Sequence, residues 1–154
     1  MRRLTILAGL IFAGTVAVAM PASVADTFPN PAALKWGPAP PVFAPGAKMA
    51  VLAGDPTKSG DFTVRLSMPS GYRIMPHYHP TVENVTVISG VFHVGMGDTF
   101  DKSKATAFVA GGFGTIPATM HHWAWASGRT IVQVQGPGPF QLLYVNPADM
   151  PKAH

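Results

Sequence analysis

Cysteine is absent from the 154-residue chain. Its absence excludes disulfide bonds, thiolate metal ligands and thiol nucleophiles together. Charged side chains are also scarce, at 12% of the residues, and they form no basic run or basic face. Nucleic acid is therefore not an expected partner, because binding to phosphates requires clustered Lys and Arg side chains.

The first 25 residues have the pattern of a cleavable export signal. Arg2 and Arg3 precede an uncharged, mostly apolar run from residue 4 to residue 20, and residues 23–25 (Ser-Val-Ala) are small enough for a signal peptidase. We expect cleavage before Asp26, no stable membrane anchor, and a bacterial protein that is periplasmic or secreted. Loss of the two arginines lowers the formal net charge from +4 to +2.

Long helical periodicity is lacking, whereas glycine and proline are abundant, with 16 of each. Short β-type runs alternate with Gly and Pro turns, which indicates an all-β sandwich or barrel. The predicted strands are residues 47–53, 61–68, 73–79, 82–88, 91–96, 113–116, 122–126, 131–135 and 140–145. The expected organisation is a signal peptide (1–25), a proline-rich extended arm with the first strands (26–60), a barrel (61–147) and a C-terminal tail (148–154).

Four side chains have the types and spacing of metal ligands. His77 and His79 are two residues apart on one predicted strand, so both imidazoles point to the same face. Glu83 opens the next predicted strand, within reach across a hairpin, and a closed barrel brings His122 to the same place. Three imidazoles and one carboxylate suit a divalent transition metal ion and leave positions open on an octahedral ion.

The spacing of these residues resembles the two sequence motifs of the cupin family. The matching residues are Gly71, His77, His79, Glu83 and Gly90 in the first motif, and Gly111, Pro117 and His122 in the second. The resemblance implies a small single-domain cupin of the RmlC-like type, with a jelly-roll β-barrel (double-stranded β-helix). It also implies one divalent transition metal ion (Mn, Fe, Ni, Zn or Cu) on His77, His79, Glu83 and His122. The alternative is a metal-free barrel whose histidines are hydrogen-bonded core residues.

Two residues depart from the second motif, since Thr119 and Ala126 stand where the family has Gly and Asn. Neither position is an expected ligand. Strand alternation places Ala124 and Ala126 on the same face as His122, and Met75 on the same face as His77. These three residues are candidate pocket residues, and Gln133 is a fourth.

His121, Trp123 and Trp125 are assigned to the face opposite His122, whereas His93 could lie on either face of its strand. The motif spacing selects His122 as the ligand, so His121 points away from the site, and His93 is not an expected ligand. Trp123 and Trp125 also alternate with His122. We expect them to cover the outside of the barrel or a subunit contact.

The leading functional hypothesis is an exported metal-binding cupin that binds or acts on a small molecule. If it is an enzyme, the resemblance implies a metal-dependent dioxygenase, isomerase or lyase, and no second catalytic group stands out in the sequence. The alternative is a non-enzymatic metal- or ligand-binding cupin whose metal is structural. Apolar side chains in the arm and the two tryptophans predict a homodimer.

Overall fold

The computed structural model describes residues 28–152, and residues 33–152 within it form one compact unit. The predicted signal peptide (1–25) lies outside the described residues. The described part contains nine strands and three 3-10 turns but no α-helix, and none of its segments could cross a membrane as a helix. The strands are β1 (Gly37–Pro38), β2 (Lys48–Ala53), β3 (Gly60–Met68), β4 (Arg73–Tyr78), β5 (Glu83–Met96), β6 (Thr106–Val109), β7 (Phe113–Ile116), β8 (His122–Gly138) and β9 (Leu143–Tyr144). The turns are η1 (Pro31–Ala33), η2 (Lys102–Lys104) and η3 (Pro147–Asp149).

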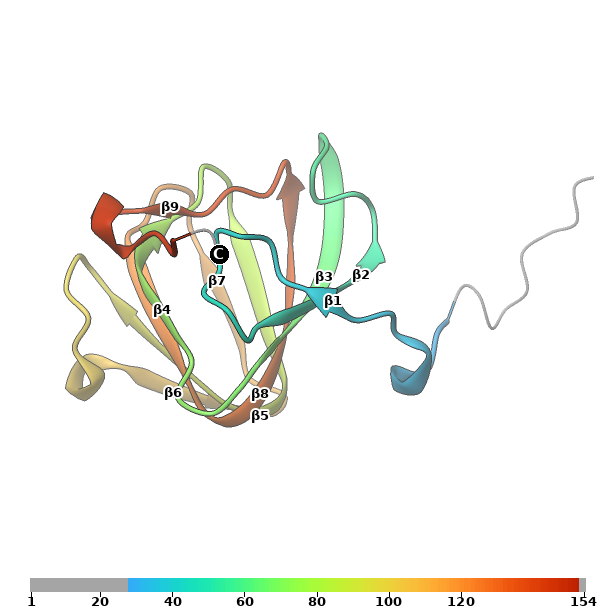
Figure 1. The fold of residues 1–154 in the computed structure, drawn as a ribbon, viewed down its shortest axis with the longest axis horizontal. Helices are drawn as coiled ribbons and strands as arrows, with labels where there is room; N and C mark the ends of the chain where they lie inside the picture. Colours follow the sequence, from blue (N-terminus) through green and yellow to red (C-terminus); the bar gives the residue numbers. More distant parts are fainter. Residues whose placement is uncertain (1–27, 153–154) are drawn as a thin grey trace, which may run out of the picture. The chain divides into compact units, whose positions relative to one another are not determined.

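Two antiparallel sheets share the long strands β5 and β8, as a jelly roll requires (Figure 1). One sheet has the order β1-β2-β3-β8-β5-β7 and uses the second half of β8 with the first half of β5. The other has the order β9-β4-β8-β5-β6 and uses the remaining halves. The predicted all-β jelly-roll fold is therefore confirmed.

The bend that divides β5 between the sheets lies at Gly90. Its φ of 79° is in the left-handed region, and a Cβ atom at this position would lie 2.4 Å from the carbonyl oxygen of Arg129. Only glycine meets both conditions without strain. The sequence predicted separate strands at 82–88 and 91–96, one on each side of Gly90, and another pair at 122–126 and 131–135. Each pair is instead one continuous strand that bends from one sheet into the other.

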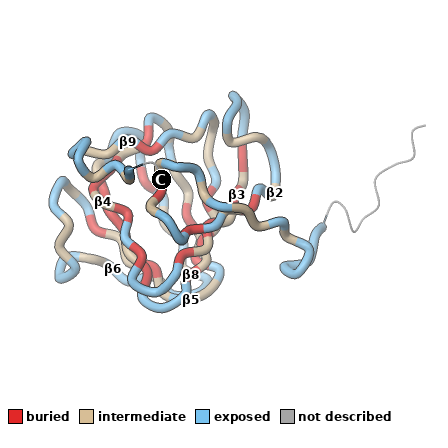
Figure 2. The backbone as a smooth tube through the Cα atoms, in the orientation of Figure 1, coloured by how far each residue is buried: buried red, intermediate tan, exposed pale blue. Residues whose placement is uncertain are grey.

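The core lies between the sheets and follows the two-residue alternation of the strands (Figure 2). In β3, for example, Phe62, Val64, Leu66 and Met68 are buried, whereas the residues between them are partly exposed. Burial of a Val or Leu side chain contributes roughly 1.5–3 kcal/mol to folding. This interior is the frame on which the candidate site is built.

The second half of the arm packs on the barrel that follows it. Phe43 is buried in the core, and two tyrosine hydroxyls donate hydrogen bonds to the carbonyl oxygens on either side of it. Tyr144 donates to Val42 at 2.9 Å and Tyr72 donates to Ala44 at 2.6 Å. Since β1 pairs with β2 and β2 pairs with β3, residues 37–53 belong to the same compact unit as residues 61–147.

The strand predictions missed three details. Strands β1 and β6 were not predicted, because each is short and lies at a sheet edge with little alternation. The predicted strand 140–145 is reduced to β9, two residues long, because this segment pairs only with the end of β4.

Candidate metal centre

Three histidines from two distant parts of the chain form a buried cluster. His77 lies in β4, His79 follows that strand, and His122 opens β8, where it pairs directly with His77 across the sheet. One nitrogen from each imidazole lies within 4.8 Å of the other two, and all three residues are at most 4% exposed. The pairing of β4 with β8 thus brings together residues 45 positions apart in the sequence.

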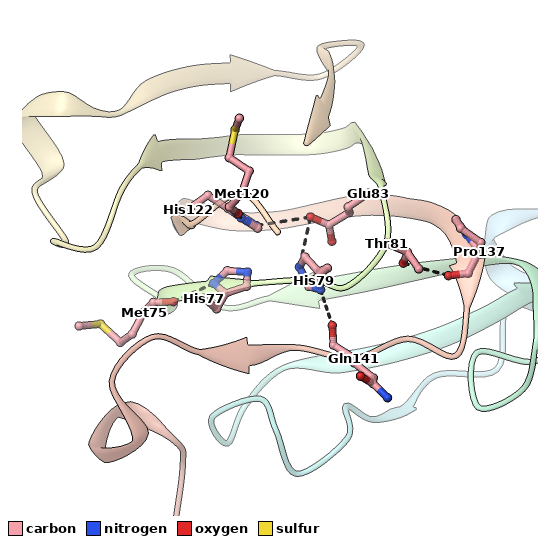
Figure 3. Close-up of polar contacts among 9 residues, drawn as sticks. All are labelled: Met75, His77, His79, Thr81, Glu83, Met120, His122, Pro137 and Gln141. Atoms are coloured by element: carbon pink, nitrogen blue, oxygen red, sulfur yellow. Dashed lines mark hydrogen bonds and ion pairs between the residues drawn. The ribbon is translucent and has the colours of Figure 1, made fainter. Parts of the chain in front are cut away.

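Backbone carbonyl groups fix the protonation of the three rings (Figure 3). The Nδ1 atom of His77 bonds to the carbonyl oxygen of Met75 at 2.7 Å, and that of His122 to Met120 at 3.0 Å. The Nδ1 atom of His79 bonds to the carbonyl oxygen of Gln141 at 2.6 Å. A carbonyl oxygen only accepts, so each Nδ1 carries a proton, and Nε2 is the nitrogen that each ring can offer to a ligand.

Glu83 lies beside two of the three imidazoles. Its Oε2 atom is 3.5 Å from Nε2 of His79 and 3.6 Å from Nε2 of His122, and its side chain is 13% exposed. The hairpin that carries His79 and Glu83 is fastened to β8, because the Thr81 hydroxyl donates a hydrogen bond to the carbonyl oxygen of Pro137 at 3.1 Å. The carboxylate is the most exposed of the four groups, so the site opens toward Glu83.

The electrostatics of the cluster favour neutral His77 and ionised Glu83. Burial, followed by repulsion from the neighbouring His122 and His79, holds the pKa of His77 well below its usual value of 6.5. Burial acts to raise the pKa of Glu83, but the close approach of His122 and the charge interactions with His79 and His122 outweigh it. The net pKa of Glu83 is therefore lowered.

These residues fit a divalent metal ion. The buried Nε2 atom of His79 has no hydrogen-bond partner, and a buried polar atom without a partner is costly unless a ligand satisfies it. An ion about 2.1 Å from each ligand atom brings those atoms roughly 3–3.5 Å apart, close to the separations between Glu83 and its two histidines. Imidazole nitrogen and carboxylate oxygen together suit the transition metals from Mn to Zn.

A small cavity of about 30 Å³ adjoins the cluster. Its polar lining consists of the three histidines and Glu83, and apolar side chains from both sheets complete it. About 10–15 Å³ of such volume holds one water molecule. The cavity thus has room for about two water-sized molecules next to the imidazoles.

Of the four candidate pocket residues, only Ala124 lines this cavity. Ala126 is fully buried in the core but lies farther along β8. Gln133 alternates with the buried Val132 and Val134, so it faces outward, where its amide oxygen accepts a hydrogen bond from Arg65 Nε at 3.3 Å.

Met75 is displaced from the cavity by an irregularity in β4. The register with β8 shifts between Ile74 and His77, so Pro76 and His77 are buried consecutively and the alternation is reversed upstream of them. Ile74 lines the cavity instead. Figure 3 shows the Met75 side chain pointing away from the imidazoles.

The expected outer position of Trp123 and Trp125 needs a correction. Trp123 is completely buried beneath Phe100, with ring centroids 4.8 Å apart. Trp125 is stacked on His93 at 3.9 Å, and the Lys102 ammonium lies 4.1 Å from its ring centroid. The loop after β5 folds back over both indoles, so they form no exposed subunit contact.

His121 lies apart from the cluster, as the motif spacing predicted. Its Nδ1 atom is 2.6 Å from the Asp98 carboxylate, and its ring stacks on Tyr78 at 5.1 Å. His93 is likewise engaged with Trp125 and not with the cluster.

Several cavity residues were not predicted from the sequence. Val85 lies two residues after Glu83 on β5 and therefore faces the same side, and Ile116 on β7 pairs with Glu83. The two-residue alternation of these strands would have identified both as cavity residues. Phe43 and Phe140 lie in the arm and in the connection after β8. No local periodicity identifies these two, because only the tertiary fold brings them to the cavity.

With the fold and the cluster established, comparison with known proteins assigns the family. The sequence model of the ChrR cupin-like domain matches residues 24–140. The chain belongs to the ChrR cupin-like family. No curated protein matches this ChrR-like cupin.

Solved structures similar to this ChrR-like cupin share its fold at low sequence identity. An RmlC-like cupin from Shewanella frigidimarina is 17% identical with a TM-score of 0.57, and the match covers 71% of this chain and 88% of that one. The polyketide cyclase RemF from Streptomyces resistomycificus is 15% identical with a TM-score of 0.63, covering 82% and 87%. A putative acetylacetone dioxygenase from Methylibium petroleiphilum is 18% identical with a TM-score of 0.59, covering 90% of each chain.

Proposed function

We propose that this cupin holds one divalent transition metal ion with His77, His79, Glu83 and His122, and binds or acts on a small molecule there. The observation that carries the proposal is the convergence of three buried imidazoles whose Nδ1 atoms are held by carbonyl groups, with the Nε2 atom of His79 lacking a hydrogen-bond partner. Glu83 adds the single negative charge that a divalent ion favours.

The division of labour among the four side chains follows from their surroundings. A bound ion would supply Lewis acidity toward a small ligand. The three histidines are held rigidly by the carbonyl groups of Met75, Gln141 and Met120 and would orient the site. Glu83, the most exposed of the four, is placed to accept a proton from a ligand in the opening.

A comparison of adjacent histidines tests the ligand set. His122→Ala removes a ligand nitrogen and should lose most of the metal, as should His77→Ala, whereas His121→Ala should retain it. The measurement is metal content by mass spectrometry on protein purified from its own host. A site emptied by His121→Ala and not by His122→Ala would refute the assignment.

Two classes of function are compatible with this site, an enzyme and a non-enzymatic binding protein. An enzyme of this fold would be a dioxygenase, isomerase or lyase, and the same fold is found in proteins with different chemistry. The alternative is a non-enzymatic protein with a structural metal. Exchange of water on the ion, measured by relaxation of solvent protons on the Mn²⁺-loaded protein, separates the two, since two exchangeable waters favour chemistry and none favours a structural role.

We also propose that the protein is exported to the periplasm or beyond. The proposal rests on the charged start, the apolar run and the small residues before Asp26. N-terminal sequencing of the protein from its native host should give a chain that begins at Asp26. A cytoplasmic protein that begins at Met1 would contradict it.

We also propose a homodimer, although two of the features that predicted it are accounted for within one chain. The two indoles that motivated it are covered by the protein's own loop, and Phe43 of the arm is buried in its own barrel. Several exposed apolar side chains, among them Val109, Phe113 and Met96, are the surface in its favour. Light scattering on the mature protein at micromolar concentration decides between dimer and monomer.

A further inference from the structure

A second and larger cavity lies at the open edge of the sandwich. It has a volume of about 300 Å³ and is bounded by β5, β6 and β7. Strands β6 and β7 are the edge strands of the two sheets, and both pair with β5, so the sheets part between them. Its size is at the lower end of the range for small-molecule pockets in proteins.

Gly114 on β7 leaves open space on one side of this cavity. It alternates with the buried Ile116 and therefore belongs to the inner face of the sheet, where a side chain would normally fill the space. A Cβ atom at Gly114 would meet no heavy atom within 4 Å, and its backbone is not in the left-handed region. Neither close packing nor backbone conformation requires glycine here. A strand glycine lowers stability, so the empty position points to a use for the space.

The lining of the cavity selects the chemistry of an occupant. Most of it is apolar, with Val87, Val94 and Phe108 among the contacts. Lys104 is the one charged residue in the lining, and no carboxylate belongs to it. Among residues 28–152, Lys104 forms an ion pair with Asp101 alone, at 3.6 Å on the exposed surface. Exposed pairs of this kind are weak, so the ammonium is available to an anion.

We propose that this pocket is a binding site for a small organic acid, with the apolar body of the ligand between β6 and β7 and its anionic group beside Lys104. The pocket shares Val85, Phe92 and Ile116 with the cavity of the histidine cluster. The occupant therefore lies against the other side of the wall that encloses the cluster. Binding in the pocket does not require metal in the cluster.

Two fluorescent probes that differ by one charge test the proposal. 8-Anilinonaphthalene-1-sulfonate carries an anionic group, whereas N-phenyl-1-naphthylamine has the same aromatic body without it. Both should bind the metal-loaded protein with enhanced emission. Decanoate should displace both probes, because it combines an apolar chain with a carboxylate.

Gly114→Leu places a side chain in the pocket and should weaken both probes at least tenfold, with metal content unchanged. Gly37→Leu is the matched control, because a Cβ atom there also meets open space but lies in β1, outside the pocket. Gly114→Ala and Gly114→Val give a graded series if the leucine variant fails to fold. Lys104→Met should weaken the sulfonate probe several-fold and leave the neutral probe unchanged.

Three outcomes would overturn the proposal. The first is probe binding by Gly114→Leu equal to that of the natural protein, which would place the probes elsewhere. The second is an equal effect of Lys104→Met on both probes, which would show that Lys104 does not bind the anionic group. The third combines two results: the natural protein binds neither probe, and light scattering shows it as a dimer that becomes a monomer in Gly114→Leu. The cavity would then be a contact between two copies of the chain.

Discussion

Each histidine of the cluster has its Nδ1 atom occupied by a backbone carbonyl group, two of them by the carbonyl two residues earlier in the chain. The spacing of His77, His79 and His122 was sufficient to predict their convergence. It could not predict their protonation, because the carbonyl that fixes His79 belongs to Gln141, 62 residues away. At this scale the sequence identifies the imidazoles, and the tertiary fold sets their tautomer.

The lowered pKa of His77 predicts how the stability of the metal-free protein depends on pH. Below 6.5, the usual value for histidine, the unfolded chain takes up a proton on His77 while the folded protein stays neutral there. The free energy of unfolding should therefore fall as the pH drops from 6.5 toward 5, by up to about 1.4 kcal/mol per pH unit for this one proton. Urea denaturation at each pH gives the measurement.

His77→Gln is the control for this pH dependence, because it removes the titrating group and keeps a polar side chain. Its free energy of unfolding should vary less over the same range. The range stops at pH 5 because the lowered pKa of Glu83 adds its own loss of stability below 4.5, its usual value. Equal slopes for the variant and the natural protein would show that His77 does not govern the effect.

Thr119 carries a strained backbone next to the site. Its φ of 62° is in the left-handed region, where the family motif has glycine, and its N–H donates a hydrogen bond to the carbonyl oxygen of His79 at 2.8 Å. A residue with a Cβ atom pays roughly 1–2 kcal/mol for this conformation. Thr119→Gly should therefore be more stable than Thr119→Ala, by about 1 kcal/mol in urea denaturation. Both variants lack the hydroxyl, so the difference isolates the backbone, and an equal stability would contradict the strain.

At the scale of elements, β4 shows why the candidate pocket was predicted only in part. Strict alternation predicted that Met75 and His77 share a face. The register shift before His77 reverses it, so that Ile74 faces the cavity. A bulge depends on pairing with β8 and leaves no reliable mark in the sequence, although Pro76 within the strand is consistent with one. In β8, which has no such shift between His122 and Ala126, alternation held.

Gly95 on β5 packs tightly against the indole of Trp123, which lies on the face of β8 opposite the cluster. A Cβ atom there would lie 1.9 Å from Cζ2 of Trp123. Gly95→Ala should displace the buried indole and lower the free energy of unfolding by about 1–3 kcal/mol. Gly114→Ala, in a strand but facing open space, is the matched control and should cost nothing. Urea denaturation monitored by circular dichroism compares them, and equal stability of the two variants would show that Trp123 has room to move.

At the scale of the whole molecule, the sequence was sufficient for the architecture but not for the coverage of its surfaces. Short strands, Gly and Pro turns and the two motifs predicted a jelly roll, and the sheets confirm it. These features did not predict which loop covers which face of the barrel. Phe100 and Lys102 lie in a polar loop of the sequence, yet they cover Trp123 and Trp125.

If the centre holds the proposed ion, its removal should lower the stability of the whole domain without unfolding it. The core includes side chains outside the cavity next to the cluster, such as Met68 and Val87, and these do not depend on an ion. An ion at 100 times its dissociation constant adds about 2.7 kcal/mol. Urea unfolding should therefore remain cooperative after chelation but shift to lower urea, and His77→Ala should show no such shift. A chelated protein without a cooperative transition would favour the structural-metal alternative.

The position of Trp123 directly after His122 gives the protein an internal optical reporter. Neighbouring Cα atoms are about 3.8 Å apart, so an indole sealed from solvent stands on one side of the strand and the imidazole cluster on the other. Paramagnetic ions such as Cu²⁺ or Ni²⁺ quench tryptophan emission at short range, whereas Zn²⁺ does not. The intrinsic fluorescence of the unlabelled chain can therefore follow both the occupancy of the centre and the class of ion within it.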